Sequence, residues 1–239
     1  MSEASGRVAV VFGGASGIGA AIVDRFTAEG WTVEVADLPD TDVTDETSVA
    51  GFLDRVVESQ GRLDLVVNSA GVSTLGNVVD LDVAEWRRVV DVCLTGAFIV
   101  MKHAGQRLTA GGSIISLSSL NARQPGAGLA PYCASKAGLS MLTEVGALEL
   151  GAQGVRVNAI APGLVVTPLT QPAMDIPGIE DDYIDNTPLG RAGTPEEIAE
   201  AAVYLANAAW VTGEVLDING GAHLMRYPDL NKHVMALFG

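Results

Sequence analysis

Three side chains in the middle of the chain have the types and the spacing needed to move a proton to or from a substrate oxygen. Tyr132 and Lys136 stand four residues apart, and Ser119 lies thirteen residues before the tyrosine, just after an apolar run. Four residues make about one helical turn, so a helix here would place the phenol and the ammonium group on one face. A fixed cation stabilises a nearby phenolate, which is the form of tyrosine that removes a proton. Ser119, leaving a strand opposite that helix, would hold an alcohol or carbonyl oxygen against the phenol.

This pair is a weak signal alone, because Tyr-x-x-x-Lys also occurs on ordinary solvated helix faces. The beginning of the chain adds to it. Residues 7–12 have the length and composition of a buried strand, the run Gly13-Gly14-Ala15-Ser16-Gly17-Ile18-Gly19 follows, and residues 20–28 are predicted to be a helix. In that context glycines let backbone N–H groups approach a pyrophosphate at a helix N-terminus. The alternative interpretation is a glycine-rich turn that binds nothing.

Asp37 indicates which cofactor such a turn would serve. It ends a second predicted strand, residues 31–36, eighteen residues after Gly19. An acidic residue at this point accepts hydrogen bonds from an adenosine ribose and repels a 2′-phosphate. Because no lysine or arginine occurs between Arg25 and Arg55, nothing local would neutralise that phosphate. The sequence therefore predicts NAD(H) and not NADP(H).

From Arg7 to about Gly221 the chain resembles the short-chain dehydrogenase/reductase family in its single-domain form. Six segments carry the resemblance in the family's order: Gly13, Gly17 and Gly19 of the turn; Asn68-Ser69-Ala70-Gly71; Ser119, Tyr132 and Lys136; Asn158 to Gly163 with Thr167-Pro168; residues 190–198; and residues 211–221. The resemblance implies that Ser119 orients the substrate oxygen, Tyr132 is the acid/base, and Lys136 holds the nicotinamide ribose and the phenolate.

The same resemblance implies a set of cofactor contacts and no metal ligand. The expected contacts are Gly13, Ser16, Gly17, Ile18, Gly19, Asp37, Asp42, Val43, Asn68, Ala70, Gly71, Tyr132, Lys136, Pro162, Gly163, Val165 and Thr167. Three positions depart from the family pattern. Phe12 replaces a threonine and Ser69 an asparagine, in groups that help tie the turn to its neighbouring strand. Cys93 replaces the asparagine that helps to hold a water chain from the lysine to solvent; as a buried thiol it is expected to be a small apolar residue rather than a reactive one.

The predicted function is an NAD(H)-dependent oxidoreductase that interconverts a secondary alcohol and a ketone. Two alternatives stay open, a 3-oxoacyl-carrier-protein reductase-like enzyme and a catalytically weak NAD-binding regulatory protein. The acidic cluster at Glu180-Asp181-Asp182 and Asp185 argues against docking of an acidic carrier protein. The presence of both Tyr132 and Lys136 argues against the regulatory protein.

Strands and helices alternate along the whole chain, which predicts an α/β fold with a doubly wound parallel sheet of Rossmann type. Helices are expected over residues 45–60, 83–108, 131–150 and 195–206, and further strands over 63–67, 113–117, 155–160 and 215–218. The prediction is one domain, residues 1–239, with six to seven strands. Only four residues separate Asp37 from Asp42, too few for a crossover helix, so the sheet edge after the second strand should be shortened. Residues 164–190 are predicted to be a substrate lid, and residues 222–239 a C-terminal tail.

Composition limits the partners of the protein. The formal net charge of −15 opposes binding to nucleic acid or anionic membranes, and no apolar stretch approaches the length of a membrane span. The two cysteines, Cys93 and Cys133, fit the reduced thiols of a cytoplasmic protein. We expect a small-molecule substrate and, from the resemblance, a homotetramer in which residues 83–108 and 131–150 pair with their copies. The alternative is a dimer, and the apolar tail is expected to pack against a partner subunit.

Overall fold

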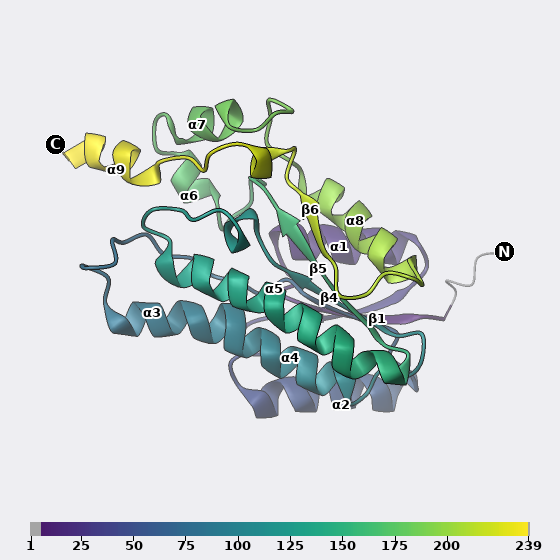
Figure 1. Cartoon of the computed structure of the whole chain (residues 1–239). Coiled ribbons are helices and arrows are strands. Elements are labelled where there is room, and N and C mark those ends of the chain that lie inside the picture. Colours follow the sequence, from purple (N-terminus) through teal and green to yellow (C-terminus); the bar gives the residue numbers. More distant parts are fainter. Residues whose placement is uncertain (1–5, 239) are drawn as a thin grey trace.

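The computed structural model describes residues 6–238, the side chains of residues 231, 237 and 238 excepted. Its centre is one parallel sheet with the strand order β2-β1-β3-β4-β5-β6 (Figure 1). The strands are β1 (Val8–Phe12), β2 (Thr32–Ala36), β3 (Leu65–Asn68), β4 (Ser113–Leu117), β5 (Arg156–Pro162) and β6 (Val215–Ile218). The predicted doubly wound α/β fold is thus confirmed, with the lower of the two expected strand numbers.

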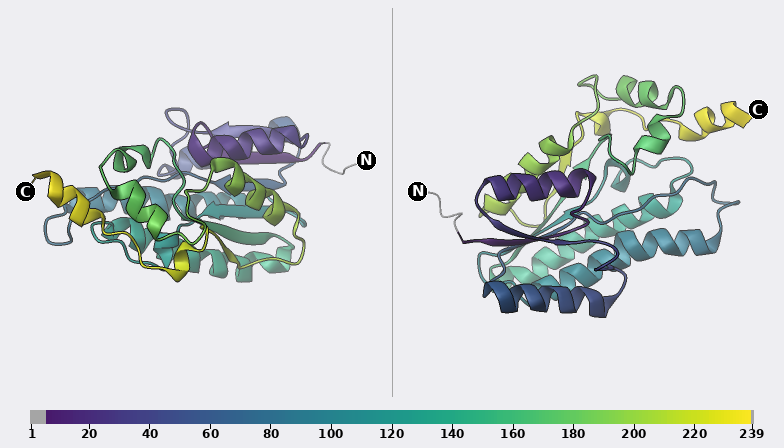
Figure 2. Two further views of the ribbon diagram at one scale, coloured as in Figure 1. Left: turned by 90° about the horizontal axis from the view of Figure 1, so that it is seen from above. Right: turned by 180° about the vertical axis from the view of Figure 1, so that it is seen from behind.

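Helices cover both faces of the sheet (Figures 1 and 2). One face carries α2 (Glu46–Gln60), α4 (Gly96–Gly105) and α5 (Ala130–Leu150), and the other carries α1 (Gly17–Ala28) and α8 (Pro195–Asn207). Successive residues of a strand point to opposite faces, so β1 serves two cores. Val8, Val10 and Phe12 belong to the first core, while Ala9 and Val11 belong to the second. Because β1 is buried on both faces, its sequence is apolar throughout and does not alternate.

The sheet ends at β2, as the short interval between Asp37 and Asp42 predicts. Residues 37–45 form turns, closed in part by the Thr41 N–H that donates to the Asp37 carbonyl at 2.9 Å. The chain then enters α2, where the Asp45 side chain accepts hydrogen bonds from the backbone N–H groups of Thr47 and Ser48. From α2 it crosses to β3 on the far side of β1. The shortened edge is therefore confirmed.

The prediction of one continuous helix over residues 83–108 is wrong. The structure has α3 (Val83–Val90), a π-helical turn at Asp91–Thr95, and then α4. Such a turn holds one residue more than an α-helical turn, and it is frequent at functional sites. Gly96 follows it at a close approach, because a Cβ there would lie 2.9 Å from Cγ2 of Val43. Apolar periodicity alone does not distinguish a π-helical turn from a continuous α-helix.

Beyond the carboxyl ends of the strands lies a group of short elements (Figure 1). They are α6 (Gln171–Met174) and α7 (Ile179–Asp185) from the predicted lid, and a 3₁₀ turn at Ala222–Leu224 and α9 (Leu230–Phe238) from the tail. Leu129, Ile179 and Leu230 form a third apolar cluster that joins them to α5. The tail thus packs on residues 164–190 of its own chain, and its expected contact with a partner subunit stays a prediction. The predicted domain and tail also include residues 1–5 and 239, which lie outside the described residues.

Candidate active site

The turn between β1 and α1 is shaped by glycines whose Cβ atoms would not fit. A Cβ on Gly19 would lie 2.0 Å from the Gly13 carbonyl oxygen, and one on Gly13 would lie 2.6 Å from the Ala70 nitrogen. The Gly13 N–H donates to the Ala36 carbonyl at 2.8 Å, and the Ser69 N–H donates to the Phe12 carbonyl at 2.8 Å. Backbone hydrogen bonds therefore order this turn, although Phe12 and Ser69 replace the family's usual side chains. Ser16 precedes α1 without capping it by its side chain, which leaves the first N–H groups of the helix for an anion.

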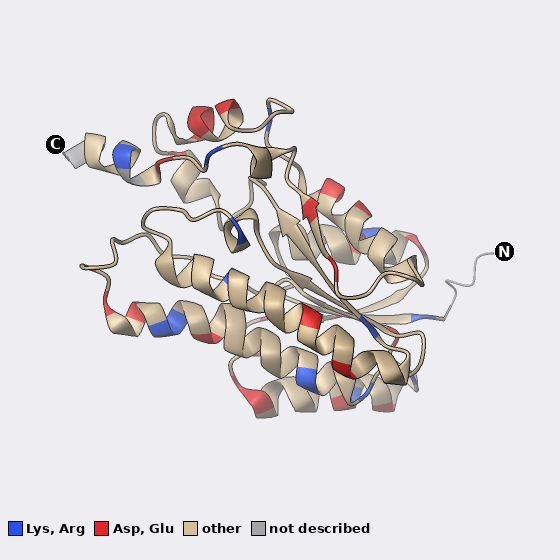
Figure 3. Ribbon diagram, viewed as in Figure 1, with Lys and Arg blue, Asp and Glu red and all other residues tan. Residues whose placement is uncertain are grey.

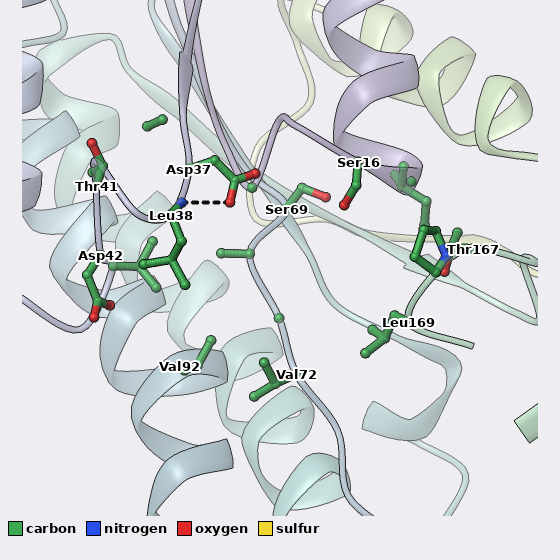
Figure 4. A pocket seen from close by; sticks show the side chains of 18 residues that line it. Ser16, Asp37, Leu38, Thr41, Asp42, Ser69, Val72, Val92, Thr167 and Leu169 are labelled. Atoms are coloured by element: carbon green, nitrogen blue, oxygen red, sulfur yellow. Dashed lines mark hydrogen bonds between the residues drawn. The ribbon is translucent and has the colours of Figure 1, made fainter. Parts of the chain in front are cut away.

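Asp37 lies at the end of β2 and is tied to the glycine turn. Its Oδ1 accepts the Leu38 N–H at 2.8 Å, as Figure 4 shows. Its Oδ2 accepts the Ala15 N–H, also at 2.8 Å. A carboxylate oxygen has room for more than one hydrogen bond, so Asp37 can still accept from a ribose. Asp42 is engaged locally, since its Oδ1 accepts from both the N–H and the hydroxyl of Thr44 at 2.8 Å.

These residues line one cavity of about 250 Å³, called here the cofactor cradle. Figure 4 shows Ser16 and Thr167 at one side of it, Thr41 and Asp42 at the other, and Asp37 between them. Of the predicted contacts, the cradle is lined by Gly13, Ser16, Gly17, Ile18, Asp37, Asp42, Val43, Ala70, Gly71 and Thr167. Thr41 also lines the cradle; it is 3% exposed, and its hydroxyl has no hydrogen-bond partner among the described residues.

The remaining predicted contacts lie outside the cradle lining. Gly19 is buried beneath the turn, and Asn68 is buried behind it, where its Oδ1 accepts the Ala70 N–H at 3.2 Å. Val165 is buried and pairs with Gly193 in an isolated β-bridge. All three support the loops that border the cradle, and their contact with the cofactor stays a prediction. Pro162 and Gly163 line a second cavity, together with Tyr132.

That second cavity, about 140 Å³, brings Ser119 and Tyr132 together; it is called here the substrate pocket. Ser119 follows β4, is 8% exposed, and accepts the Asn121 N–H on its Oγ at 3.1 Å. Tyr132 lies in the first turn of α5, which begins at Ala130 with Pro131 next to it, where proline fits a helix start. Chain segments thirteen residues apart thus meet at the end of the sheet, as the sequence predicts.

Lys136 lies one turn along α5, between the two cavities. It is 4% exposed, its Nζ lies 5.5 Å from the centroid of the Tyr132 ring, and it donates to the Leu117 carbonyl at 2.6 Å. A Cβ built on Gly71 would lie 3.8 Å from this Nζ and 4.0 Å from Sγ of Cys93. The ammonium group therefore sits beneath the Gly71 turn that lines the cradle, and beside the phenol of the pocket.

Cys93 is 1% exposed and holds the same turn from the π-helical segment. Its Sγ donates to the Val72 carbonyl at 3.2 Å and accepts the Val72 N–H at 3.4 Å. The thiol thus takes both hydrogen-bonding roles of an amide, with longer and weaker bonds. The buried state agrees with the expectation of a structural cysteine.

Sequence reasoning missed several residues of both cavities. Thr41, Val92 and Leu169 line the cradle, and Tyr183, Tyr227 and Leu230 line the substrate pocket. The position of Thr41, four residues after Asp37, was the one available signal for the cradle. The pocket residues come from the predicted lid and the tail, where no motif or periodicity marks a particular side chain.

Neither a metal cluster nor a membrane span is found in the part of the chain that the structure describes. Within residues 6–238, no group of three or more histidine, cysteine, aspartate or glutamate side chains is arranged to hold a metal ion. None of the helices in that range combines the length and the apolar character needed to cross a bilayer.

Comparison with known proteins gives matches over most of the chain. The family model described as Enoyl-(Acyl carrier protein) reductase matches residues 36–223. The cis-4-hydroxycyclohexanecarboxylate dehydrogenase of Sinomonas cyclohexanicum is 38% identical, over 90% of this chain and 96% of that protein. The 3-oxoacyl-(acyl-carrier-protein) reductase FabG of Thermotoga maritima is 33% identical, over 90% of this chain and 97% of that protein.

Solved structures match the fold as a whole. A short-chain type dehydrogenase/reductase from Mycobacterium ulcerans superposes with a TM-score of 0.94 at 33% identity, covering 98% of this chain and 96% of that one. A small-chain dehydrogenase in complex with NADPH superposes with a TM-score of 0.83 at 33% identity, covering 91% of this chain and 99% of that one. The second structure shows that this fold also takes the phosphorylated cofactor.

Proposed function

Because this chain belongs to the short-chain dehydrogenase/reductase family, whose members bind a nicotinamide cofactor, we propose that it is an NAD(H)-dependent oxidoreductase acting on a secondary alcohol or ketone. The observation that carries the proposal is the meeting of Ser119 and Tyr132 in one small pocket, with Lys136 buried behind the phenol. Such a pocket provides a hydrogen-bonding group and an acid/base for one substrate oxygen, as this chemistry requires.

The preference for NAD(H) is supported by the charges of the cradle. Its described lining includes Asp37 and Asp42 and no lysine or arginine. A 2′-phosphate near Asp37 would lose its hydration without gaining a cation. The adenosine ribose, by contrast, would donate its hydroxyls to Asp37. The Asp37 carboxylate is held for this role by the Ala15 and Leu38 N–H groups.

The roles of the three polar residues follow from their positions. The bound nicotinamide would accept a hydride in oxidation and supply it in reduction. Tyr132 takes the hydroxyl proton of an alcohol or returns it to a carbonyl oxygen, and Ser119 orients that oxygen. Lys136 lies beside the phenol, with its Nζ 5.5 Å from the centroid of the Tyr132 ring, and would also hold the nicotinamide ribose. Its hydrogen bond to the Leu117 carbonyl, at the end of β4, fixes the ammonium group while the substrate changes.

The substrate is proposed to be a compact alcohol, and alicyclic alcohols are the first to test. The substrate pocket of about 140 Å³ is smaller than the 300–1,000 Å³ typical of sites for drug-sized ligands. The 38% identical relative bears the name of a dehydrogenase for a hydroxylated cyclohexane ring. Residues 164–190 would act as the lid over this pocket, since their α6 and α7 supply part of its lining.

The test is a set of secondary alcohols and ketones assayed with NAD⁺ or NADH by the nicotinamide absorbance, with wild type and Tyr132→Phe. We expect Tyr132→Phe to lower kcat by about a thousandfold, within the 10²–10⁴ range for loss of a general acid/base, while NADH affinity stays within about twofold. Tyr204→Phe, on the exposed side of α8, is the matched control and should leave turnover unchanged. Substantial turnover by Tyr132→Phe would refute the assignment of the acid/base.

A second candidate function is reduction of a 3-oxoacyl thioester. It is favoured by the 33% identical FabG and by the description of the matching family model. Against it stand Glu180 and Asp181, exposed on α7 beside the pocket, where acidic residues gather on the ribbon (Figure 3). They would repel a carrier protein that is itself acidic. Faster turnover of acetoacetyl thioester with NADPH than of any alcohol with NAD⁺ would select this alternative.

We also propose that the enzyme assembles as a homotetramer, with a dimer as the alternative. Support comes from large apolar side chains left exposed on α4 and α5, namely Phe98, Met141, Val145 and Leu148. Exposed apolar residues on adjoining helices are typical of a subunit interface. Light scattering at micromolar concentration should give the mass of four chains, and the mass of one chain would refute assembly.

A further inference from the structure

Two tyrosines that the mechanism does not use lie in the substrate pocket, and both come from distant parts of the chain. Tyr183 belongs to α7, Tyr227 belongs to the tail, and both line the pocket that holds Ser119 and Tyr132. Their rings pack edge to face with centroids 5.7 Å apart, and their hydroxyl oxygens are 2.6 Å apart. A short hydrogen bond between two phenols thus joins the predicted lid to the tail inside the pocket.

The local backbone is adapted to this pair. A Cβ built on Gly126 would lie 2.8 Å from Cε1 of Tyr227, so the glycine leaves room for the ring against the main chain. Gln124, two residues earlier, donates through Nε2 to the Ala222 carbonyl at 2.9 Å and the Met225 carbonyl at 2.7 Å. These bonds fix the start of the tail, and with it the position of the Tyr227 ring. Residues 124–126 therefore hold the Tyr227 ring, to which Tyr183 is hydrogen-bonded.

One of the two phenol hydrogens is not used in the hydrogen bond between Tyr183 and Tyr227. Each phenol has one O–H, and whichever donates within the pair, the other hydrogen is not used there. Within the described residues, the structure gives no acceptor for this second hydrogen. Both tyrosines are half-buried and line the pocket, so the second phenol hydrogen is offered to a ligand oxygen that enters it.

The pair is also electrically neutral over the working range of an enzyme. Burial raises the pKa of Tyr183 to about 12, against a smaller effect of the hydrogen bond to Tyr227. Burial likewise raises the pKa of Tyr227, although a hydrogen bond from the Asn121 side chain acts in the opposite direction. The charge of Tyr132 opposes ionisation of either one. Both phenols thus stay protonated while Tyr132 gains and loses its proton.

No residue among those described that line the substrate pocket carries a formal charge. Apart from its hydroxyls and Asn121, the lining is apolar, with Leu120, Leu129, Met174 and Leu230 among its members. A carboxylate placed here would lose its hydration and find no cation, which is a large cost. A neutral hydroxyl or carbonyl would lose little and would gain the free phenol hydrogen.

We propose that Tyr183 and Tyr227 determine substrate specificity by binding a second, uncharged oxygen of the substrate while Ser119 and Tyr132 hold the reacting one. The substrate class is thus a compact neutral diol or hydroxyketone, and not a simple alcohol or a hydroxy acid. This inference rests on the proposed oxidoreductase function of the same pocket.

The test compares three probes of similar ring size with NAD⁺: cyclohexanol, each isomer of 1,4-cyclohexanediol, and 4-hydroxycyclohexanecarboxylate. Wild type should oxidise one diol isomer with a kcat/KM at least about tenfold above that of cyclohexanol and above that of the hydroxy acid. Tyr183→Phe and Tyr227→Phe keep the rings and remove one hydroxyl each. In either variant kcat/KM for the diol should fall about tenfold, while that for cyclohexanol stays within about twofold.

Controls separate this role from a merely structural one. Tyr204→Phe should leave kcat/KM unchanged for both cyclohexanol and the diol. The double variant Tyr183→Phe/Tyr227→Phe should lose little more kcat/KM for the diol than one single variant, since the two phenols act as a unit. If Tyr183→Phe and Tyr227→Phe lowered kcat/KM equally for cyclohexanol and the diol, the pair would only close the pocket, and the inference would be overturned. Turnover by wild type without a preference for the diol would also overturn it, and leave the proposed function standing. No NADH formation from any of the alcohols would overturn both.

Discussion

The cofactor cradle and the substrate pocket share one edge of the sheet but are built in different ways. The cradle is made largely of backbone, at the turn after β1 and the turn after β3, with Asp37 and Thr41 at the end of β2. The substrate pocket is made largely of side chains, and many of them come from α6, α7 and the tail. A backbone site tolerates change in few positions, whereas a side-chain site can be altered one residue at a time. The two regions should therefore respond to substitution with very different magnitudes.

The largest effect is expected where a side chain is added to the cradle backbone. In Gly19→Ala the new Cβ would lie 2.0 Å from the Gly13 carbonyl oxygen, so the turn must move away from the helix. We expect NADH affinity to fall at least about a hundredfold, because the N–H groups that hold the pyrophosphate move with it. Fluorescence titration with NADH measures the change.

Gly51→Ala is the matched control for that substitution. Gly51 lies inside α2, and only Nη1 of Arg55, at 3.7 Å, is near its Cβ position. Alanine there should stabilise the protein by up to about 1 kcal/mol without changing NADH affinity. If Gly19→Ala bound NADH as tightly as Gly51→Ala, the cradle would not depend on the backbone approach described above.

The next effect concerns the charge at the cradle rim. Asp37→Asn keeps an oxygen for one of the two backbone N–H groups and removes the negative charge that opposes a 2′-phosphate. The ratio of NADPH to NADH dissociation constants should shrink about tenfold. Asp40→Asn, exposed and outside the cradle lining, should leave the ratio unchanged. Equal affinity of wild type for the two cofactors would contradict the proposed NAD(H) preference.

Substitutions near the substrate pocket should have smaller effects, and the contact between α7 and the tail provides an example. Asp182 is 12% exposed and receives the Arg226 guanidinium at 2.6 Å, the His233 ring at 3.2 Å and the Asp229 N–H at 3.1 Å. Burial opposes ionisation of Asp182, but these partners together lower its pKa. Arg226 is 62% exposed, so solvent screens its part of the interaction. Asp182→Asn should raise amide hydrogen exchange in residues 179–185 about fivefold at pH 7.

The sign of the pH dependence follows from that lowered pKa. The contact stabilises the tail fully above the unfolded-state pKa of about 4, and it is lost as the pH falls below that value through the lower folded-state pKa. The exchange difference between wild type and Asp182→Asn should therefore narrow in acid. Asp181→Asn, on an exposed neighbour, should exchange like wild type at both pH values. Equal exchange of both variants at pH 7 would show that Asp182 does not hold the tail.

The same contrast explains how much could be predicted from the sequence. The strands, the glycine turn, Asp37 and the Ser119–Tyr132–Lys136 set could be placed because each depends on local spacing and on the parallel order of the sheet. Tyr183 and Tyr227 could not, because they meet through contacts between segments 44 residues apart. The π-helical turn at Asp91–Thr95 could not be predicted for another reason, because one extra residue in a turn leaves the apolar pattern almost unchanged. Asn68 lies in the turn after β3, as predicted, where its side chain is buried and its Oδ1 accepts the Ala70 N–H.

The smallest effect is expected at Cys93, which holds the edge of the cradle through Val72. Asparagine has a donor and an acceptor, so Cys93→Asn can restore both contacts that the thiol makes with the Val72 backbone. Turnover should stay within about twofold of wild type or rise, because proton return past Lys136 then gains a better hydrogen-bonding group. Cys93→Ala removes both contacts and should lower the free energy of unfolding by about 1–2 kcal/mol, measured by urea denaturation. Loss of activity in Cys93→Asn, together with inactivation of wild type by mild alkylation, would instead identify an essential thiol.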